Sequence, residues 1–564
     1  MTRTRVWTSA AVLGAAALVV AGCGGDSKSS ESTVSTGGAT GAQPAGGIKK
    51  GGTGRFNLQS DTDYVDPALA YYQVSWQLEY ATCVKLLNYP DKTGAAGAQL
   101  RPEAAESLPT VSADGKTYTF TVRPGFKFSP PSTEAVTAET FKFTINRALN
   151  PAMQSPAAQF ITDIEGAQDV LDKKAKEASG VTVAGNELTV RLTKKAPDFL
   201  ARIAMPFFCA VPLDTPIARN GVQKVAGAGP YYIASWEPKR QIVLKKNPNY
   251  GGDRPQNLDS IVYTVGVTPQ ASVLQIQKGS VDYAADGIPP TSHAEVGPKY
   301  GPDSEAAKNG KQQYFVNPLL SFNYLALNTT RPTFQDTKLR KAVSYAIDRR
   351  QILKQSGAYA GDPTDHYLPP GTPGSTGTGS AYPLDKPDVE KAKQLAGDTK
   401  RKAVLYTCNT APCPQRAQIV QANLAAVGID VEVKQFERAV QFGKEGTKGE
   451  PFDIADEGWV ADYNDPYDFI NVLLYGKSIT DSNNVNFSYF DDPEYDKKME
   501  EASRLSGEER FKTYGDLDLN IAKNAAPLAA WSNSNERDFF SARMGCQLYQ
   551  TVYGMDIAAL CLRQ

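Results

Sequence analysis

Residues 416–433, RAQIVQANLAAVGIDVEV, constrain the fold more than any other stretch of this chain. Apolar residues recur from Val420 to Val427 at three- and four-residue intervals, which is the spacing of one face of a helix. Gly428 follows, at the position where a glycine ends a helix. Apolar and polar residues then alternate from Ile429 to Val433, as in a half-buried strand. The segment therefore predicts a helix, a glycine cap and a strand in succession.

Other segments show the same helical and strand spacings of apolar residues. The spacing predicts helices over 138–149, 337–347 and 389–397, a strand over 117–122, and a hairpin that turns at Gly185 and Asn186. Asp388 is a candidate helix cap, and Pro151 a stop. The stretch 369–388 is rich in Pro, Gly, Ser and Thr and predicts a surface loop. Because helices and strands alternate, we expect an α/β body with a mixed or parallel sheet in this half.

The body from about residue 53 to residue 564 is too long for one ordinary core and indicates about three domains. The hydrophobic content is 41%, and the formal net charge of −1 favours neither nucleic acid nor a basic membrane-binding face. No segment after the first 22 residues is long and apolar enough to cross a membrane.

The first 22 residues read as a signal peptide, with a basic start, a short apolar run and small residues before Cys23. Ala21, Gly22 and Cys23 resemble a bacterial lipobox, so we expect cleavage before Cys23 and lipidation of that residue. The alternative is an ordinary secretory signal with an incidental cysteine. Residues 23–52 contain almost no large apolar side chain and predict a flexible tether to the membrane.

Six cysteines remain beyond Cys23, an even number that suits disulfides in an oxidising compartment. No CxxC spacing and no zinc-ligand spacing occurs, so we expect neither a redox motif nor a metal site. Six cysteines permit 15 pairings. The pairs favoured by their positions are Cys408–Cys413, Cys546–Cys561 and Cys83–Cys209.

The stretch GWVADYNDP, residues 458–466, is the main candidate for chemistry. Asp462 and Asp465 could act as the paired carboxylates of a hydrolase, although acid pairs at this spacing are common in loops. A calcium loop fails because Pro466 stands where the next ligand should be. The two histidines, His293 and His366, lie in no nucleophile motif, and we interpret them as surface or loop residues.

Five collinear blocks carry a resemblance to a known family. They are ESLPTVSADGKTYTFTVRPGFKF with the helix after it, GAGPYYIASWEPKRQIVLKKNPNYGGDRPQNLDSIVYTV, LQIQKGSVDYAADGIP, LALNTTRPTFQDTKLRKAVSYAIDRRQIL and FDIADEGWVADYNDPYDFINVLLYG. In this order the chain resembles the large extracytoplasmic solute-binding proteins of ATP-binding-cassette importers, in the peptide, dipeptide and nickel family. It departs from the family after Phe128, where KFSPPSTEA replaces an Asp-Gly, so ligand contacts there are expected to differ.

The resemblance implies a two-lobed, periplasmic-binding-protein-like fold of type II, with three domains, mixed sheets and a hinge between the lobes. The implied first domain comprises residues 53–98, 220–320 and 530–564. A second domain is inserted at 99–219, and residues 321–529 form the other lobe.

The resemblance also implies a ligand site between the lobes. Asp462 aligns with the aspartate that accepts a peptide's α-ammonium group, and Asp465 is expected to form its own turn. Trp459 is either a cleft wall or a core residue. Tyr71, Tyr72 and Gln73 are placed on an edge that pairs with the backbone of an extended peptide, or serve as packing residues. Asn328 is a further candidate near the cleft.

The implied function is that of a monomeric, lipid-anchored receptor on the outer face of the cytoplasmic membrane. It would capture peptides and deliver them to permease subunits driven by an ATPase, without a cofactor and without chemistry. A second possibility is the same fold binding an oligosaccharide, a siderophore or a metal chelate. A third, from another class, is a secreted carboxylate-dependent hydrolase.

Overall fold

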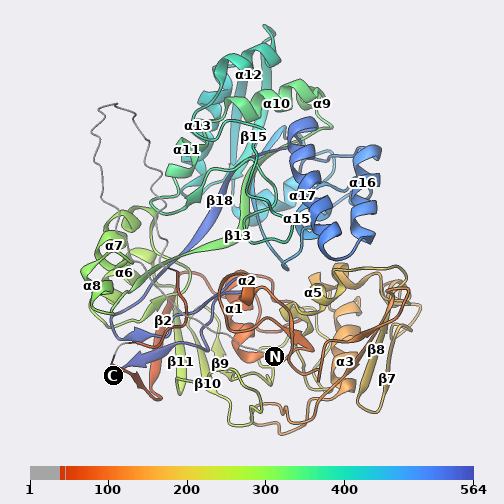
Figure 1. Cartoon of the computed structure of the whole chain (residues 1–564), viewed down its shortest axis with the longest axis vertical. Coiled ribbons are helices and arrows are strands. Elements are labelled where there is room, and N and C mark those ends of the chain that lie inside the picture. Colours follow the sequence, from red (N-terminus) through yellow and green to blue (C-terminus); the bar gives the residue numbers. More distant parts are fainter. Residues whose placement is uncertain (1–37, 45) are drawn as a thin grey trace, which may run out of the picture. The chain divides into compact units, whose positions relative to one another are not determined.

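The helix, cap and strand predicted over residues 416–433 are all present. In the computed structural model, which describes residues 38–44 and 46–564, helix α13 spans Cys413–Ala425 and strand β16 spans Ile429–Phe436 (Figure 1). Gly428 lies between them with φ of 82°, a left-handed conformation that favours glycine. The α/β prediction is confirmed.

A six-stranded mixed sheet contains β16 and the strands nearest the predicted site. Its order is β14-β18-β13-β17-β15-β16, in which β15 pairs parallel with β16 and β17, whereas β13 pairs antiparallel with β17 and β18. Helices α10, α12 and α13 share a buried apolar cluster with this sheet. The bounds are β13 Tyr314–Leu327, β14 Gly361–Asp362, β15 Arg401–Cys408, β17 Ile454–Val460, β18 Leu528–Phe539, α10 Thr337–Ala346 and α12 Val389–Ala396.

A five-stranded sheet combines the start of the described chain with its middle, in the order β12-β2-β11-β10-β9. The end of the chain packs into the same buried cluster, to which Phe56, Tyr263 and Ile557 all belong. The bounds are β2 Thr53–Leu58, β9 Tyr231–Glu237, β10 Gln241–Lys246, β11 Ser260–Val265 and β12 Tyr283–Ala284. The chain therefore returns at its C-terminus to the body in which its described part begins.

The predicted hairpin of residues 99–219 is part of a separate four-stranded sheet, and the predicted helix of the same region is present as well. Strands β7 (Val181–Ala184) and β8 (Glu187–Arg191) form the hairpin, β6 (Thr117–Thr121) pairs with β8, and α3 spans Ala138–Leu149. The three-domain division remains a prediction. Strand β13 crosses its boundary at residue 320, next to a shift in pairing with β18 between Pro318 and Phe322.

All three expected disulfides are present, and they join Cys83 to Cys209, Cys408 to Cys413 and Cys546 to Cys561. Cys23 and the predicted signal peptide lie outside the described residues. Among residues 38–44 and 46–564, no helix has the length and apolar character to span a bilayer.

The interpretation of the two histidines as surface or loop residues is wrong for His293, which is the first residue of helix α7 (His293–Tyr300), whereas His366 does lie in a loop but not at the surface. His293 is buried and its Nδ1 lies 2.8 Å from the hydroxyl of Tyr314, while His366 is buried against the carboxylate of Asp518. Burial lowers the pKa of His293 to about 3. Their contacts fix them as packing residues, which no local sequence signal reveals.

Candidate functional site

A cavity of about 260 Å³ lies where strands β15 and β17 diverge. The two strands pair only at Leu405–Ile454 and Tyr406–Ala455, and β15 then continues along β16 alone. From Asp456 to Val460, the edge of β17 opposite β13 has no strand partner within the described sheet. An unpaired strand edge beside a cavity can pair with an extended ligand through its backbone.

Trp459 forms part of the wall of this cavity, and its half-buried side chain also packs against a buried apolar cluster, so each alternative describes part of its surroundings. Its indole Nε1 donates to Asp468 Oδ2 over 3.2 Å. The backbone N–H of Asp462 donates to the same oxygen over 2.9 Å. Asp468, in the first turn of helix α15 (Tyr467–Leu474), therefore fixes both the indole and the turn that carries Asp462.

Asp462 is buried, with 7% of its surface exposed, and its Oδ2 accepts a hydrogen bond of 2.8 Å from the hydroxyl of Tyr71. Among the described residues, no Lys, Arg or His side chain forms an ion pair with it. Burial raises the pKa of Asp462 to about 7, and the hydrogen bond from Tyr71 opposes this shift. Asp462 is thus a desolvated carboxyl group that a cationic ligand group would stabilise in its charged form.

Asp465 stands three residues away in a contrasting environment. Its Oδ1 accepts from the backbone N–H of Tyr467 over 2.8 Å, as expected of a residue that forms its own turn. Both of its carboxylate oxygens also accept hydrogen bonds of 2.7 Å from Arg510. The ion pair is buried, so the carboxylate of Asp465 is used within the protein and has a structural role.

The structure argues against the backbone-edge alternative for Tyr71, Tyr72 and Gln73, while Tyr71 packs against Trp76 and Phe207, as the packing alternative expects. The backbone N–H groups of Tyr71 and Tyr72 both donate to Asp63 Oδ2, and Gln73 is the first residue of helix α1 (Gln73–Thr82). These backbone groups therefore do not form a free strand edge. Tyr71 reaches Asp462 through its side chain instead, while Tyr72 is 60% exposed.

Asn328 is almost fully buried and its side chain is satisfied within the protein. Its Nδ2 donates to the backbone of Phe452, and its Oδ1 accepts from the backbone N–H and the hydroxyl of Thr330. It does not line the cavity of about 260 Å³. These contacts give Asn328 the role of joining two segments of the chain.

Sequence reasoning missed two arginines that line the cavity, Arg416 and Arg438. Each lies in the first turn of a helix, Arg416 in α13 and Arg438 in α14 (Arg438–Glu445). The available signal was weak but real: cations stabilise the C-terminal end of a helix, so an arginine in the first turn is placed against the helix dipole.

Comparison with known proteins places the chain in a family. Residues 99–481, more than half of its length, match the model of bacterial extracellular solute-binding proteins, family 5. The chain belongs to this family. It is therefore a solute-binding protein and not an enzyme, and the hydrolase alternative is removed.

The periplasmic oligopeptide-binding protein OppA of Escherichia coli (strain K12) is 25% identical over 457 residues, which cover 77% of this chain and 80% of OppA. The solved structure of clavulanic acid biosynthesis oligopeptide binding protein 2 matches with a TM-score of 0.83 at 22% identity, over 94% of this chain and 99% of that one. DppA from Helicobacter pylori, solved with the peptide STSA, matches with a TM-score of 0.73 at 22% identity, over 92% and 99%. These structural matches establish the two-lobed fold of this solute-binding protein.

Proposed function

We propose that this solute-binding protein captures peptides for an ATP-binding-cassette importer, and that Asp462 accepts the α-ammonium group of the ligand. The observation that carries the proposal is the contrast within one turn. Asp465 is neutralised by Arg510, whereas Asp462 is buried with only a hydroxyl as its side-chain partner among the described residues. A ligand ammonium group would supply the missing cation through a charge-assisted hydrogen bond.

The unpaired edge of β17 supports a peptide as the ligand. Gly458, Trp459 and Val460 line the cavity, and Asp462 follows two residues after this edge without lining the cavity itself. A chain bound at Asp462 by its N-terminus would extend from there along the edge of β17. Backbone pairing reads no side chain and therefore accepts many sequences. The similarity to OppA, which is named for oligopeptide binding, points in the same direction.

Delivery to a permease and attachment to the membrane belong to the same proposal. Lipidation at Cys23 would hold the monomeric receptor at the outer face of the cytoplasmic membrane, and residues 23–52 would serve as its tether. The ligand would favour lobe closure by the contacts that it makes only in the closed state. Domains at 53–98 with 220–320 and 530–564, at 99–219 and at 321–529 would provide the two lobes.

Mass spectrometry of the molecules released when the purified protein is denatured tests the proposal. The expected result is a set of peptides with free N-termini, recovered in near-stoichiometric amount. A matched preparation of the Asp462→Asn variant should release less peptide. Recovery of an oligosaccharide, a siderophore or a metal chelate in place of peptide would contradict the proposal.

A further inference from the structure

The Cys408–Cys413 disulfide forms part of the wall of the cavity beside β17. Both cysteines line this cavity, whose volume of about 260 Å³ is large enough to admit a small thiol reagent. Cys83 borders a cavity of only about 10 Å³, which is about the size of one water molecule, and Cys546 and Cys561 line neither of these two cavities. A reagent can therefore reach the Cys408–Cys413 bridge without unfolding of the protein.

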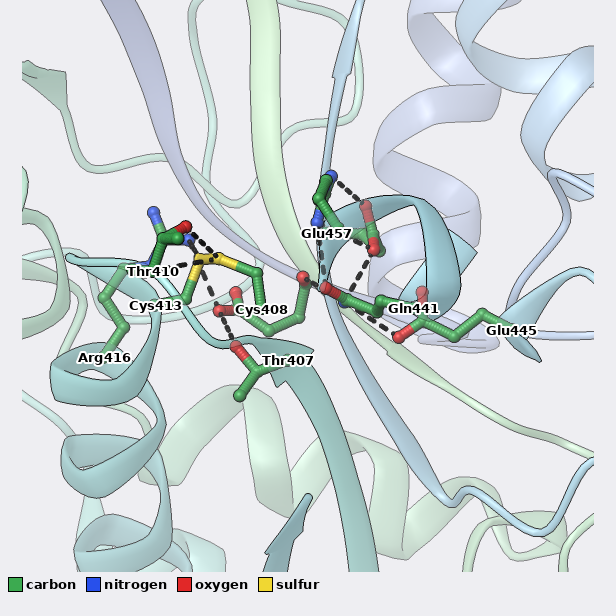
Figure 2. The surroundings of a disulfide bond; sticks show 10 residues. Thr407, Cys408, Thr410, Cys413, Arg416, Gln441, Glu445 and Glu457 are labelled. Carbon is green, nitrogen blue, oxygen red and sulfur yellow. Dashed lines mark hydrogen bonds and ion pairs between the residues drawn. A yellow bond between two sulfur atoms is a disulfide. The ribbon is translucent and has the colours of Figure 1, made fainter. Parts of the chain in front are cut away.

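The bridge spans only five positions, from the end of β15 to the first residue of α13 (Figure 2). Opening a loop this short adds little freedom to the unfolded chain, so the bridge contributes less to stability than one across a long loop. Helix α13 also packs against the sheet through a buried apolar cluster that includes Ala417, Val420 and Leu405. The helix and the strand therefore stay together when the bridge opens.

Cys413 is placed to carry the negative charge that appears when the bridge opens. It is the first residue of α13, a helix of 13 residues, so the partial positive charge of the helix N-terminus acts on its sulfur. Arg416 Nη2 also donates to Cys413 Sγ over 3.3 Å. Asp456 Oδ2, 3.4 Å from the same nitrogen, offsets part of this charge but leaves the hydrogen bond to the sulfur in place. A thiolate at Cys413 is stabilised by both groups.

Cys408 has the opposite surroundings. Its Sγ lies 3.4 Å from the backbone oxygen of Thr410 and 3.5 Å from the hydroxyl oxygen of the same residue (Figure 2). A carbonyl oxygen repels a negative charge but accepts a hydrogen bond from a thiol S–H. Cys408 is therefore suited to the neutral thiol form. Because a better stabilised thiolate leaves faster, Cys413 is the better leaving group of the two.

We infer that the Cys408–Cys413 bridge is a site of thiol–disulfide exchange with a dithiol, at which the dithiol attacks Cys408 and Cys413 leaves. In the first step a thiolate of the dithiol bonds to Cys408 Sγ, the bond between the two cysteines breaks, and its electron pair leaves on Cys413 Sγ. The second sulfur of the dithiol, as a thiolate, then displaces Cys408. The dithiol is oxidised to a disulfide and gives up two protons, and the two cysteines take up two protons as thiols.

The chain has no CxxC spacing, so the inference comes from the contacts of the bridge and not from a redox motif. It goes beyond the proposed function, and its tests need no ligand. The redox state of the bridge would change the wall of the cavity, because the bridge joins β15 to the first turn of α13 there.

Timed reduction of the purified, folded protein by dithiothreitol tests the site. Samples are quenched with acid, denatured and alkylated, and peptide mass spectrometry then reports the state of each cysteine. We expect Cys408 and Cys413 to be reduced about tenfold faster or more than the Cys83–Cys209 and Cys546–Cys561 bridges at neutral pH. Equal rates for the three bridges, or earlier reduction of another bridge, would overturn the inference.

Glutathione, a monothiol, tests which sulfur is attacked. After a brief reaction and a quench with N-ethylmaleimide, we expect glutathione on Cys408 and maleimide on Cys413, in about tenfold excess over the reverse pattern. An excess of glutathione on Cys413 would overturn the assignment of the leaving group.

Substitution of Arg416 tests its role as a positioning residue for the leaving sulfur. Arg416→Gln should bring the two glutathione patterns toward equal amounts, whereas Arg416→Lys should retain part of the preference for Cys408. Arg240→Gln is the matched control and should keep the full preference, because the side chain of Arg240 is 79% exposed in the turn between β9 and β10. An unchanged preference in Arg416→Gln would overturn the role of this arginine.

Discussion

The hydroxyl of Tyr71 donates a 2.8 Å hydrogen bond to Asp462 although the two residues are 391 positions apart in the sequence. Tyr71 precedes helix α1 of the body built from the start of the described chain, and Asp462 follows β17 of the six-stranded sheet. The bond thus links the part of the protein that contains the five-stranded sheet to the part that contains the six-stranded sheet. It does so at the carboxyl group that we propose binds the ligand's ammonium group. A hydroxyl donor stabilises the charged carboxylate and leaves it able to accept further bonds.

Peptide affinity should depend on pH through Asp462. Burial raises the pKa of Asp462 to about 7, so the carboxylate form becomes more populated as the pH rises from 5 to 7. Because an ammonium group prefers the carboxylate, affinity should rise over the same interval and fall above pH 8 as the peptide's own amine loses its proton. Calorimetry across this range measures the profile, and Asp462→Asn should flatten its acidic limb.

Tyr71→Phe should move this profile. The hydrogen bond from Tyr71 lowers the pKa of Asp462, so its loss should shift the midpoint of the acidic limb to higher pH and weaken binding near neutrality. Tyr72→Phe serves as the control, since Tyr72 is the exposed neighbour. A midpoint that is the same in Tyr71→Phe and the unaltered protein would show that the hydroxyl does not act on the carboxyl group.

Local sequence signals predicted those features of the fold and of the site that depend on neighbouring residues. Helix α3 and the cap of α12 by Asp388, whose Oδ1 accepts from Lys391, follow from side chains three or four positions apart. The turn at Asp465 was equally local. Arg510, its ion-pair partner, lies 45 residues away on helix α17 (Gly507–Asn524), and no pattern within the turn indicates it.

Asp465→Asn should destabilise the protein and spare ligand binding. The substitution leaves Arg510 buried without its carboxylate, and breaking a buried pair in this way costs about 3–5 kcal/mol of unfolding free energy. Denaturant unfolding measures the change. Asp385→Asn, which removes the exposed partner of Arg350, is the control and should have little effect. A variant as stable as the unaltered protein would argue against a structural role for Asp465.

The three disulfides should differ in their contribution to stability. Cys83–Cys209 spans 126 residues and Cys408–Cys413 spans five. In the chain-entropy model, closing loops of these sizes lowers the entropy of the unfolded chain and stabilises the folded protein by about 5 and about 2 kcal/mol respectively. Paired Cys→Ala variants should therefore show a larger drop in unfolding free energy for the long loop. The reverse order would show that the short bridge stabilises the protein mainly through the native state.

Burial was the property that sequence patterns predicted least well. Asn328 was expected near the cleft and His366 at the surface or in a loop, yet contacts from distant segments bury both. Arg416 and Arg438 were missed for the opposite reason, because arginines near helix ends are ordinary surface residues until a cavity is placed beside them. The chemistry of each side chain could be read from the sequence. The contacts that determine what the side chain does come from residues that are distant in the sequence and become neighbours only in the folded chain.

The most direct test of Asp462 as the ammonium acceptor is a four-way calorimetric comparison. A peptide with a free N-terminus and its N-acetylated match are titrated into the unaltered protein and into Asp462→Asn, with Asp465→Asn as the control for altered charge in the same turn. We predict that acetylation of the peptide alone, or Asp462→Asn alone, weakens binding by about tenfold or more. Acetylation should have little further effect on binding to Asp462→Asn. If Asp462→Asn and the unaltered protein bind the free peptide equally, or if acetylation weakens binding equally in both, Asp462 does not hold the ammonium group.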